Sequence, residues 1–346
     1  MGTNQTVVIT EFLGDGIGPE LQKSVHDVAA ALPIKLEFDP IDLTYENRQK
    51  VGPAIYDQAM ASMNKTKLAF KYPTVTKGES PNAKLRNLCN FSVIHRPVIS
   101  IPGINSNFKE NIELHIIRVA TGGTYEHGGE MVSKDVAVSL RIVERGPCLE
   151  AAEYAFMLAK KFNKTVTSAS KYTIQRVTDG LFEECVKQVA KKYAEIPHQV
   201  ELFDALLAKR ILKPNKYQVV VCLNEYGDFL SDMACGLVGS LGTGASASIA
   251  FDSNLKPTMA MFDPAGGTAP DIAGQNKVNP AAALLALSML LNHIDHYDLG
   301  HPLRLAIRSL IAEHECTVDL GGKLTCTEFT SKVIERMKQE MKSPTG

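Results

Sequence analysis

The stretch YQVVVCLNEYGDFLSD, residues 217–232, joins an apolar run to a polar segment that carries two aspartates. Its first part, residues 217–223, is rich in β-branched residues and predicts a buried strand. Asp228 and Asp232 follow four residues apart, a spacing that puts both side chains on one face of a helix. A buried strand that leads directly into a helix is typical of an α/β unit, so this stretch indicates both a fold class and a candidate site.

Outward from this stretch, strand-like and helix-like segments alternate along the chain. The expected strands are residues 6–10, 112–118 and 165–170, and the expected helices are residues 21–32, 148–162, 179–193 and 281–294. Short β-branched runs between helical apolar stripes predict an α/β fold with a largely buried sheet. The Gly-rich segment GGTYEHGGEMVSKDVAVSL, residues 122–140, interrupts this pattern and predicts an inserted β-structure, interpreted as an interface arm.

Composition limits the class of protein. The 346 residues carry a formal net charge of −1, with 45% hydrophobic and 22% charged residues. Neither nucleic acid nor a membrane is expected as a partner, because the chain has no excess positive charge and no apolar run of roughly 20 residues. The seven cysteines are odd in number and form no C-x-x-C pair, which indicates reduced thiols in the cytoplasm or in a mitochondrial matrix.

Residues 14–20, GDGIGPE, lie where a strand should end and a helix begin, and they allow two interpretations. A dinucleotide-binding loop requires the spacing G-x-G-x-x-G, which this G-x-G-x-G-P run lacks. A tight turn with Pro19 at a first helical position explains the run without a ligand. The spacing favours the turn.

The paired aspartates also allow two interpretations. Solvated carboxylates near a helix N-terminus would be stabilised by the helix dipole, which suits Asp228 better than Asp232. The flanking runs VVVCL and MACGLVG are apolar, however, and like charges on a buried helix need a counter-charge. A divalent cation with oxygen ligands would supply that charge. These residues alone leave both interpretations open.

Three arginines are candidates for anion binding. Arg86 and Arg96 lie in the segment SPNAKLRNLCNFSVIHRP, and Arg118 ends an apolar strand. Because a guanidinium group binds carboxylates bidentately, three of them beside an acidic pair would suit a polyanionic, metal-chelating acid. Each arginine taken singly also fits a surface ion pair.

Several segments together resemble the isocitrate/isopropylmalate dehydrogenase family of β-decarboxylating dehydrogenases. They are GDGIGPE, SPNAKLR, HRPVISIPG, KYTIQRVTDGLF, NEYGDFLSD, GGTAPDIAGQNKVNP and DLGGKLTCTEFT, and the resemblance extends from about residue 6 to residue 337. It implies a two-domain α/β fold that is not a Rossmann fold, with a mixed central sheet flanked by helices. It also implies a homodimer or higher oligomer, with a β clasp at the dimer interface and active sites shared between subunits.

The resemblance implies how the chain divides and where a metal binds. Residues 1–99 and 255–346 would form a large cofactor-side domain, and residues 100–254 a small domain with the dimer clasp and the metal site. Asp228 and Asp232 match two metal ligands from one subunit, and Asp204 matches a third that the neighbouring subunit provides. The expected ion is Mg²⁺ or Mn²⁺.

The resemblance also assigns catalytic, substrate and cofactor positions. Tyr125 and Lys171 match the catalytic pair, with Lys171 donated across the dimer. The matches to substrate-binding positions are Ser80, Asn82, Arg86, Arg96 and Arg118, and those to cofactor-binding positions are Gly267, Thr268, Asp271, Ile272 and Asn279. Asp271 follows the NAD-preferring pattern, because a carboxylate there accepts hydrogen bonds from a ribose diol and repels a 2′-phosphate.

Some positions depart from the family pattern. Gly266 stands where a cofactor-facing histidine is usual, and Val119 and Ala120 stand where Glu and Asn are usual. Thr173 replaces an Asn near the nicotinamide, and Glu225 replaces a more usual apolar or amide residue. The departures gather on the cofactor side, whereas the substrate, metal and proton-transfer positions are retained.

The resemblance therefore implies NAD-dependent oxidative decarboxylation of isocitrate to 2-oxoglutarate and CO₂, a step of the tricarboxylic acid cycle. Related 2-hydroxy acids, namely isopropylmalate, homoisocitrate and tartrate, remain open as substrates. A catalytically silent regulatory or structural subunit of a hetero-oligomer is the alternative from another class. The departures favour that alternative, and the retained Tyr125 and Lys171 disfavour it.

Overall fold

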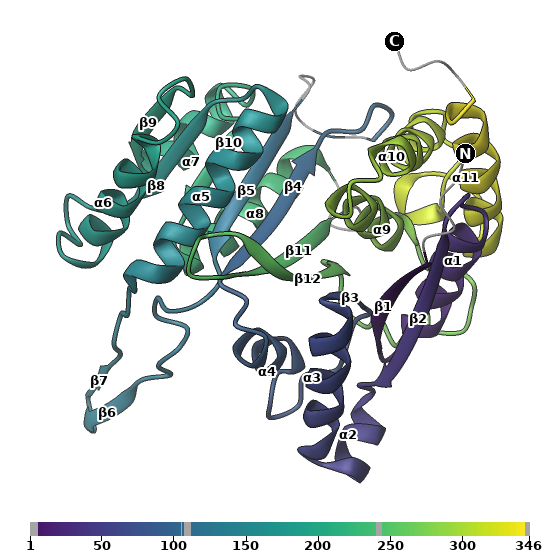
Figure 1. The fold of residues 1–346 in the computed structure, drawn as a ribbon, viewed down its shortest axis with the longest axis horizontal. Helices are drawn as coiled ribbons and strands as arrows, with labels where there is room; N and C mark the ends of the chain where they lie inside the picture. The colour runs from purple at the N-terminus through teal and green to yellow at the C-terminus, as the bar shows by residue number, and fades with distance from the viewer. Residues whose placement is uncertain (1–5, 105, 107–111, 240–243, 343–346) are drawn as a thin grey trace.

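The computed structural model describes residues 6–104, 106, 112–239 and 244–342, and its centre is one mixed β-sheet (Figure 1). Ten strands of the described chain form the sheet in the order β2-β1-β3-β12-β11-β4-β5-β10-β8-β9. In that order their bounds are Lys35–Asp42, Thr6–Leu13, Leu68–Lys71, Pro257–Pro264, Ala245–Phe251, Val93–Ile99, Glu113–Val119, Val219–Cys222, Val166–Ser170 and His198–Leu202.

Helices cover both faces of this sheet. They are α1 (Gly18–Ala30), α2 (Tyr45–Val51), α3 (Ala54–Thr66), α4 (Pro81–Leu88), α5 (Arg145–Phe162), α6 (Thr178–Ala190), α7 (Phe203–Leu212), α8 (Asn224–Val238), α9 (Ala281–His293), α10 (Tyr297–Ala312) and α11 (Cys326–Glu340), with a short 3-10 helix, η1 (Val318–Leu320). The predicted mixed sheet flanked by helices is confirmed, and so are the helix and strand expected within residues 217–232.

Strand direction changes across the sheet. The outer strands β2, β1 and β3 at one end and β5, β10, β8 and β9 at the other pair in parallel, whereas β12, β11, β4 and β5 are joined by antiparallel pairings. Parallel neighbours need crossover helices, which explains the alternation in the sequence. The sheet is buried, and every residue of Val219–Cys222 is buried on both faces, as the apolar run predicts.

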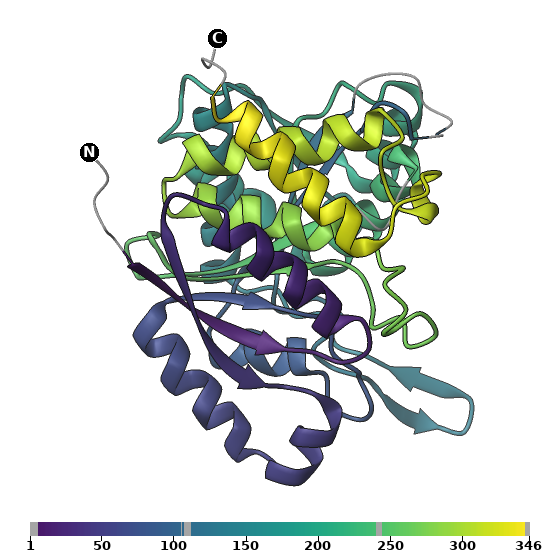
Figure 2. The ribbon, with the colours of Figure 1, turned by 90° about the vertical axis from the view of Figure 1, so that its right-hand side faces the viewer.

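The two faces of the sheet carry different cores. Val219 and Val221 point into one continuous apolar cluster with α1, α5, α6, α9, α10 and α11. The alternate residues Val220 and Cys222 point into a separate cluster with α7 and α8, and a third cluster with α2, α3 and α4 lies towards the other end of the sheet. On this second face β4 and β5 contribute Val98, Leu114 and Ile116 to the core with α7 and α8, whereas Ile94 of β4 belongs to neither of the two cores. In the views of Figures 1 and 2, α1 and α11 lie side by side, so both ends of the chain join one half of the molecule.

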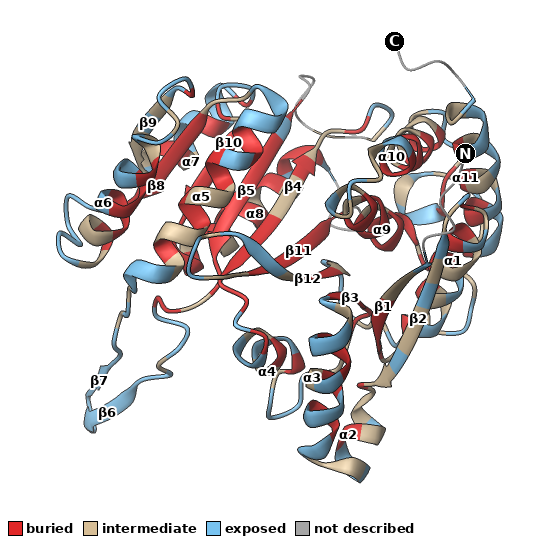
Figure 3. Ribbon diagram, viewed as in Figure 1, coloured by how far each residue is buried: buried red, intermediate tan, exposed pale blue. Residues whose placement is uncertain are grey.

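A two-stranded arm projects from the body of the molecule, as predicted for residues 122–140 (Figure 3). It consists of β6 (Glu130–Ser133) and β7 (Val136–Val138), and all seven strand residues are exposed. Met131, Val132 and Val136 are 63%, 64% and 52% exposed although their side chains are apolar. A hairpin with exposed apolar side chains is marginal on its own, which suits a segment that packs against a partner.

The division into residues 1–99 plus 255–346 and residues 100–254 stays a prediction, because one hydrogen-bonded sheet spans both parts. Within the described residues, no helix has the length and apolar character needed to cross a bilayer.

Candidate active site

The candidate site lies on the second face of the sheet, between the two separate cores. Strands β4 and β5 pair antiparallel with Ile94 opposite Arg118 and Arg96 opposite Ile116. Arg96 and Arg118 are therefore diagonal neighbours on the same face. Helix α8 leaves the neighbouring strand β10 and carries Asp228 towards this pair.

Asp228 is the centre of the arrangement. Its Oδ1 atom accepts hydrogen bonds from Arg118 Nη1 and from Arg96 Nη1, the latter at 3.2 Å. Its Oδ2 atom accepts one from the hydroxyl of Tyr125 at 3.3 Å. Arg118 is further held by Asn224, whose Oδ1 accepts from Arg118 Nε at 2.9 Å. Two guanidinium groups and a phenol thus converge on one carboxylate.

Gly227 makes this convergence possible. A Cβ atom at position 227 would lie 2.6 Å from Arg118 Cβ and 2.7 Å from its Cγ. These separations are shorter than any normal carbon–carbon contact, so a side chain there would displace the arginine. The glycine in the motif NEYGD is therefore required by the close approach of α8 to β5.

A third guanidinium group, that of Arg86, approaches from α4. Arg86 Nη1 donates to the carbonyl oxygen of Ala120 at 3.1 Å, just beyond the end of β5. Burial, followed by the positive charges of Arg118 and Arg96, lowers the pKa of Arg86 to about 10. Arg96 Nε is buried without an acceptor among the described residues. The arginines repel one another and leave one donor unpaired, an arrangement whose charge and donors suit an anion with several acceptor groups.

Ser80 and Asn82 begin the helix that carries Arg86. Ser80 is the N-cap of α4 and its Oγ accepts from the Ala83 amide at 3.4 Å, with Pro81 following at the first turn. Asn82 is exposed one turn before Arg86, so both project from the same side of α4. The cap explains how a serine at this position also fixes the start of the helix.

Lys171 and Asp204 form a second group, separate from the first. Lys171 follows β8 and Asp204 lies in the first turn of α7, and their side chains form an ion pair of 2.7 Å. That contact lowers the pKa of Asp204. Across the described residues, no three acidic, histidine or cysteine side chains gather closely enough to hold a metal ion. We refer to the residues around Asp228 and to the Lys171–Asp204 pair as two half-sites, because Asp204 does not complete a metal-ligand cluster with Asp228 and Asp232 among the described residues.

The acidic side chains fit a hard divalent cation only when both half-sites are combined. Asp232 is exposed one turn after Asp228 on α8, so the two carboxylates share a side of the helix. Both supply oxygen donors, which Mg²⁺ and Mn²⁺ prefer. Asp204 is exposed on α7 and is available to a second copy of the chain. The donor set matches the predicted metal site if Asp204 comes from that copy.

The loop of residues 265–276 carries most of the predicted cofactor positions, and the GDGIGPE segment holds it in place. Ile17 N donates to the carbonyl oxygen of Thr268 at 2.9 Å, and Gly16 has a positive φ of +58°. A Cβ atom on Gly16 would lie 2.0 Å from that same oxygen. The carboxylate of Glu20 accepts the amides of Gly274 and Asn276 at 2.8 and 2.7 Å. The glycine-rich segment is thus a packing turn, and the predicted turn is confirmed.

A small cavity of about 190 Å³ opens beside this loop. Gly266, Gly267 and Asn279 are among its lining residues. Asn279 also contacts α9, where its Oδ1 accepts the amide of Ala281 at 2.9 Å. Asp271 is exposed and Ile272 half-buried on the same loop. A larger cavity of about 460 Å³ lies on the opposite face of the sheet between α5, α9 and α10, and none of the predicted site residues lines it.

The geometry agrees with comparisons to known proteins. The sequence profile of the isocitrate/isopropylmalate dehydrogenase family matches residues 8–333. The chain belongs to the isocitrate/isopropylmalate dehydrogenase family. Its members are decarboxylating dehydrogenases, so a hydroxy acid is the expected substrate class.

The family members similar to this chain include proteins named as catalytic subunits and one named as a regulatory subunit. The chain is 35% identical to isocitrate dehydrogenase (NAD) catalytic subunit 5, mitochondrial, of Arabidopsis thaliana, covering 96% of this chain and 88% of that protein. It is 31% identical to a mitochondrial regulatory subunit of isocitrate dehydrogenase (NAD) from Dictyostelium discoideum, covering 98% and 94%. The crystal structure of isocitrate dehydrogenase from Methylococcus capsulatus superposes with a TM-score of 0.85 at 30% identity, covering 96% of this chain and all of that one.

The departures from the isocitrate/isopropylmalate dehydrogenase pattern have distinct structural settings. Val119 and Ala120 are 3% and 1% exposed, and Ala120 presents only its carbonyl oxygen to the site. Thr173 is exposed after Lys171, and Gly266 is exposed beside the small cavity. At positions 119 and 120 this family member therefore offers packed apolar groups in place of polar ones.

Two charged residues near the site, buried Lys71 and half-buried Asp263, were not predicted from the sequence. Lys71 is 2% exposed at the end of β3, and its Nζ donates to the carbonyl oxygen of Tyr72 at 2.9 Å. Burial lowers the pKa of Lys71 to about 8, and the negative charge of the nearby Asp263 carboxylate opposes this shift. Asp263 lies near the end of β12, and its Oδ1 has no partner among the described residues. The signal available in the sequence was a single charge near the end of each of two apolar strands.

Proposed function

We propose that this chain is a NAD-dependent isocitrate dehydrogenase that forms 2-oxoglutarate and CO₂ with Mg²⁺ or Mn²⁺. The observation that carries the proposal is the gathering of three guanidinium groups near Asp228, with the Tyr125 hydroxyl on the same carboxylate. Three clustered positive charges suit a tricarboxylate better than a monocarboxylate. The names of relatives such as the Arabidopsis catalytic subunit support the same substrate.

In this proposal the arginines bind and orient the substrate. Arg86, Arg96 and Arg118 grip its carboxylates, and the unpaired Nε of Arg96 takes one of the oxygens. Ser80 and Asn82, at the start of α4, provide polar contacts for the carboxylate that distinguishes isocitrate from isopropylmalate. Their position near Arg86 on the same helix supports this assignment.

Tyr125 and Lys171 move the protons. Lys171 of a second copy takes or relays the proton of the C2 hydroxyl group while the hydride leaves C2. After the C3 carboxylate has left as CO₂, Tyr125 donates a proton to C3. A phenol is protonated at neutral pH, and desolvation together with the neighbouring Asp228 carboxylate raises the pKa of Tyr125 further, so its hydroxyl group holds a proton to donate.

Acidic side chains and one loop would hold the metal and the cofactor. Asp228 and Asp232 of one copy and Asp204 of the other would hold the divalent cation, which supplies a positive charge that acidifies the hydroxyl group and attracts electrons from the breaking bond. The loop with Gly267, Thr268, Asp271 and Ile272 would bind NAD⁺, the acceptor of the hydride, together with Asn279. The exposed Asp271 suits a ribose diol and disfavours a 2′-phosphate.

The proposal includes a dimer, a domain division and a compartment. Because Asp204 joins no metal-ligand cluster with Asp228 and Asp232 among the described residues, a complete metal site would need two copies, with the β6–β7 arm as clasp. Residues 100–254 would form the small domain and the two outer segments the large one. Mitochondrial names among the relatives support a mitochondrial matrix, with the cytoplasm as the other compartment.

A catalytically silent subunit is the second candidate function. The buried Val119 and Ala120 and the exposed Gly266 favour it, since each removes a polar group from the cofactor side. Such a protein would bind isocitrate and metal through the retained arginines and aspartates without reducing NAD⁺. One relative is named as a regulatory subunit.

A turnover assay on the purified chain separates these functions. We expect NADH to form with isocitrate, Mg²⁺ and NAD⁺, and turnover to be slower with NADP⁺ as acceptor or with isopropylmalate, homoisocitrate or tartrate as substrate. Arg118→Lys should abolish most of this activity, whereas Arg336→Lys, in the exposed pair between Arg336 of α11 and Glu313 at the end of α10, should not. If isocitrate with Mg²⁺ stabilises the chain in a thermal-shift assay but no NADH forms, the silent-subunit function is supported and the enzyme function is rejected.

A further inference from the structure

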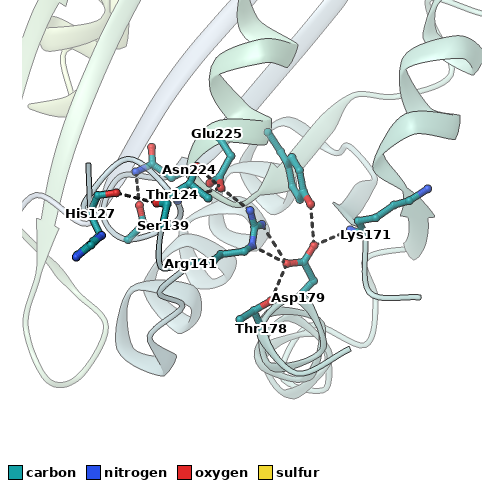
Figure 4. A network of polar contacts seen from close by, with 11 residues as sticks. Thr124, His127, Ser139, Arg141, Lys171, Thr178, Asp179, Asn224 and Glu225 are labelled. Carbon is teal, nitrogen blue, oxygen red and sulfur yellow. Dashed lines mark hydrogen bonds and ion pairs between the residues drawn. The ribbon is translucent and has the colours of Figure 1, made fainter. Parts of the chain in front are cut away.

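Three charged side chains connect the two loops that carry Tyr125 and Lys171 (Figure 4). Arg141, on the return from the β6–β7 arm, lies between Glu225 and Asp179. It donates through Nη1 to Glu225 Oε1 and through Nη2 and Nε to Asp179 Oδ1, the latter two at 3.0 and 3.2 Å. Glu225 is 4% exposed and Asp179 is fully buried. We refer to these three residues as the Glu225–Arg141–Asp179 network.

One end of the network fixes the backbone at Tyr125. Glu225 Oε1 accepts from both the amide and the hydroxyl of Thr124, each at 3.1 Å. Thr124 directly precedes Tyr125. Gly123, with φ +73°, leaves room for the carboxylate, because a Cβ atom there would lie 2.1 Å from Glu225 Oε2. Glu225, a departure from the family pattern, therefore has a defined partner loop.

The other end fixes the backbone at Lys171. Asp179 Oδ2 accepts the Lys171 amide at 2.7 Å and the Tyr226 hydroxyl at 3.0 Å. The Tyr226 ring stacks on Phe203 with ring centroids 4.4 Å apart, and Arg141 Cζ lies 4.9 Å from the centroid of the same tyrosine ring. Phe203 directly precedes Asp204. The network thus reaches both residues of the second half-site.

The charges of the network are not balanced. Two buried carboxylates share one guanidinium group, and Glu225 Oε2 is buried without a partner among the described residues. Buried ion networks are weak sources of stability, because desolvation offsets most of the attraction between the charges. Stability therefore does not explain why the network is present. Its contacts with the loops of Tyr125 and Lys171 favour a role in fixing the geometry of those loops.

We propose that this network is a positioning device that holds Tyr125 and Lys171 in fixed relative positions through their backbones. The proposal rests on the proposed function, in which these two residues serve different active sites of a dimer. The network then connects Tyr125, the proton donor of one active site, to Lys171, the proton-transfer residue of the other. Glu225, Arg141 and Asp179 are positioning residues, because their contacts with these loops run through the Thr124 and Lys171 amides and the Thr124 hydroxyl.

Amide hydrogen exchange tests the positioning without any turnover. Glu225→Gln keeps the side-chain shape and removes the charge that holds Arg141. We expect the Thr124 and Lys171 amides both to exchange about tenfold faster, because loosening one end releases the other. Arg141→Lys keeps the charge but loses the fork that joins two carboxylates, and should do the same.

The controls are Glu313→Gln and Arg336→Lys, which make the same substitutions in a solvent-exposed ion pair between the end of α10 and α11. They should leave exchange at Thr124 and Lys171 unchanged. Faster exchange confined to Thr124 in Glu225→Gln would overturn the proposal, because the two loops would then be independent. This readout decides the matter even if the parent chain turns over no isocitrate.

Kinetics give the second readout. In Glu225→Gln we expect kcat to fall about tenfold while KM for isocitrate changes less than about twofold, because misplacing proton-transfer groups costs rate and the arginines are untouched. The solvent isotope effect on kcat should increase as proton transfer becomes slower. A fall in kcat that matches only the loss of folded protein, with an unchanged isotope effect, would reduce the network to a structural role.

Discussion

At the scale of single residues, Gly227 is the most constrained position of the candidate site. In Gly227→Ala the new methyl group would overlap Arg118, so we expect the arginine to move and KM for isocitrate to rise about tenfold or more. The free energy of unfolding should fall by about 1–3 kcal/mol despite the better helix propensity of alanine. Substrate kinetics and chemical denaturation measure the two effects.

Gly236 is the matched control on the same helix. A Cβ atom there meets nothing within 4 Å, so Gly236→Ala should leave KM unchanged. Its stability should rise by about 1 kcal/mol from helix propensity alone. Equal behaviour of the two variants would show that α8 does not constrain Arg118.

Lys71 should make stability depend on alkaline pH. Its pKa of about 8 in the folded chain is lower than that of an unfolded lysine, so burial of the charged form destabilises the fold below pH 8. Between pH 8 and about 10.5 the folded state loses this proton first, and stability rises with pH. Over this pH range we expect the free energy of unfolding of the parent to rise by up to roughly 3 kcal/mol relative to that of Lys71→Met. Denaturation curves at several pH values measure the difference, and a constant difference would contradict it.

At the scale of elements, the β6–β7 arm offers a test of assembly. Val132 is 64% exposed in β6, and we expect Val132→Asp to weaken the proposed dimer because it places a charge in an apolar contact. Sedimentation velocity should show more monomer at the same protein concentration. Val318→Asp is the control, since Val318 is 72% exposed in η1, outside the arm. Identical sedimentation of both variants and the parent would exclude the arm from the interface.

Elements of the fold could be predicted where local pattern decides them. The β10–α8 unit follows from an apolar run and a helical spacing, and the arm from its glycines and alternation. The Glu225–Arg141–Asp179 network could not be predicted, because Arg141 is separated from Asp179 by 38 positions and from Glu225 by 84. Pairings between residues so far apart in the sequence depend on the order of the strands in the sheet, such as the neighbouring positions of β5 and β10, and that order is not readable from local sequence pattern. Asp228, Asp232 and the three arginines were candidates from the residues alone, and the other site residues were found through family resemblance. Lys71 and Asp263 offered only a single charge near the end of an apolar strand.

At the scale of the whole molecule, the division into two half-sites predicts a complementation result. Tyr125→Phe and Lys171→Met should each be nearly inactive alone. When the two variants are mixed and allowed to exchange subunits, half of the dimers are hybrids with one intact site of two. We therefore expect about a quarter of the parent activity, measured as NADH formation.

The matched control mixes Tyr125→Phe with Asp228→Asn. Both substitutions affect the same half-site, so neither site of the hybrid is intact and activity should not return. No recovery in the first mixture would place all reacting groups in one chain, whereas recovery in the control would place Tyr125 and Asp228 in different half-sites.

The proposed sharing of one active site between two copies, with Lys171 from one and Asp228 from the other, also has a consequence for abundance. A catalyst whose parts meet only when two copies associate loses specific activity on dilution, and at low expression its output scales with the square of its concentration. A cell that halves synthesis of such a chain would lose up to three quarters of the flux it carries, so modest changes in transcription would act as a steep control.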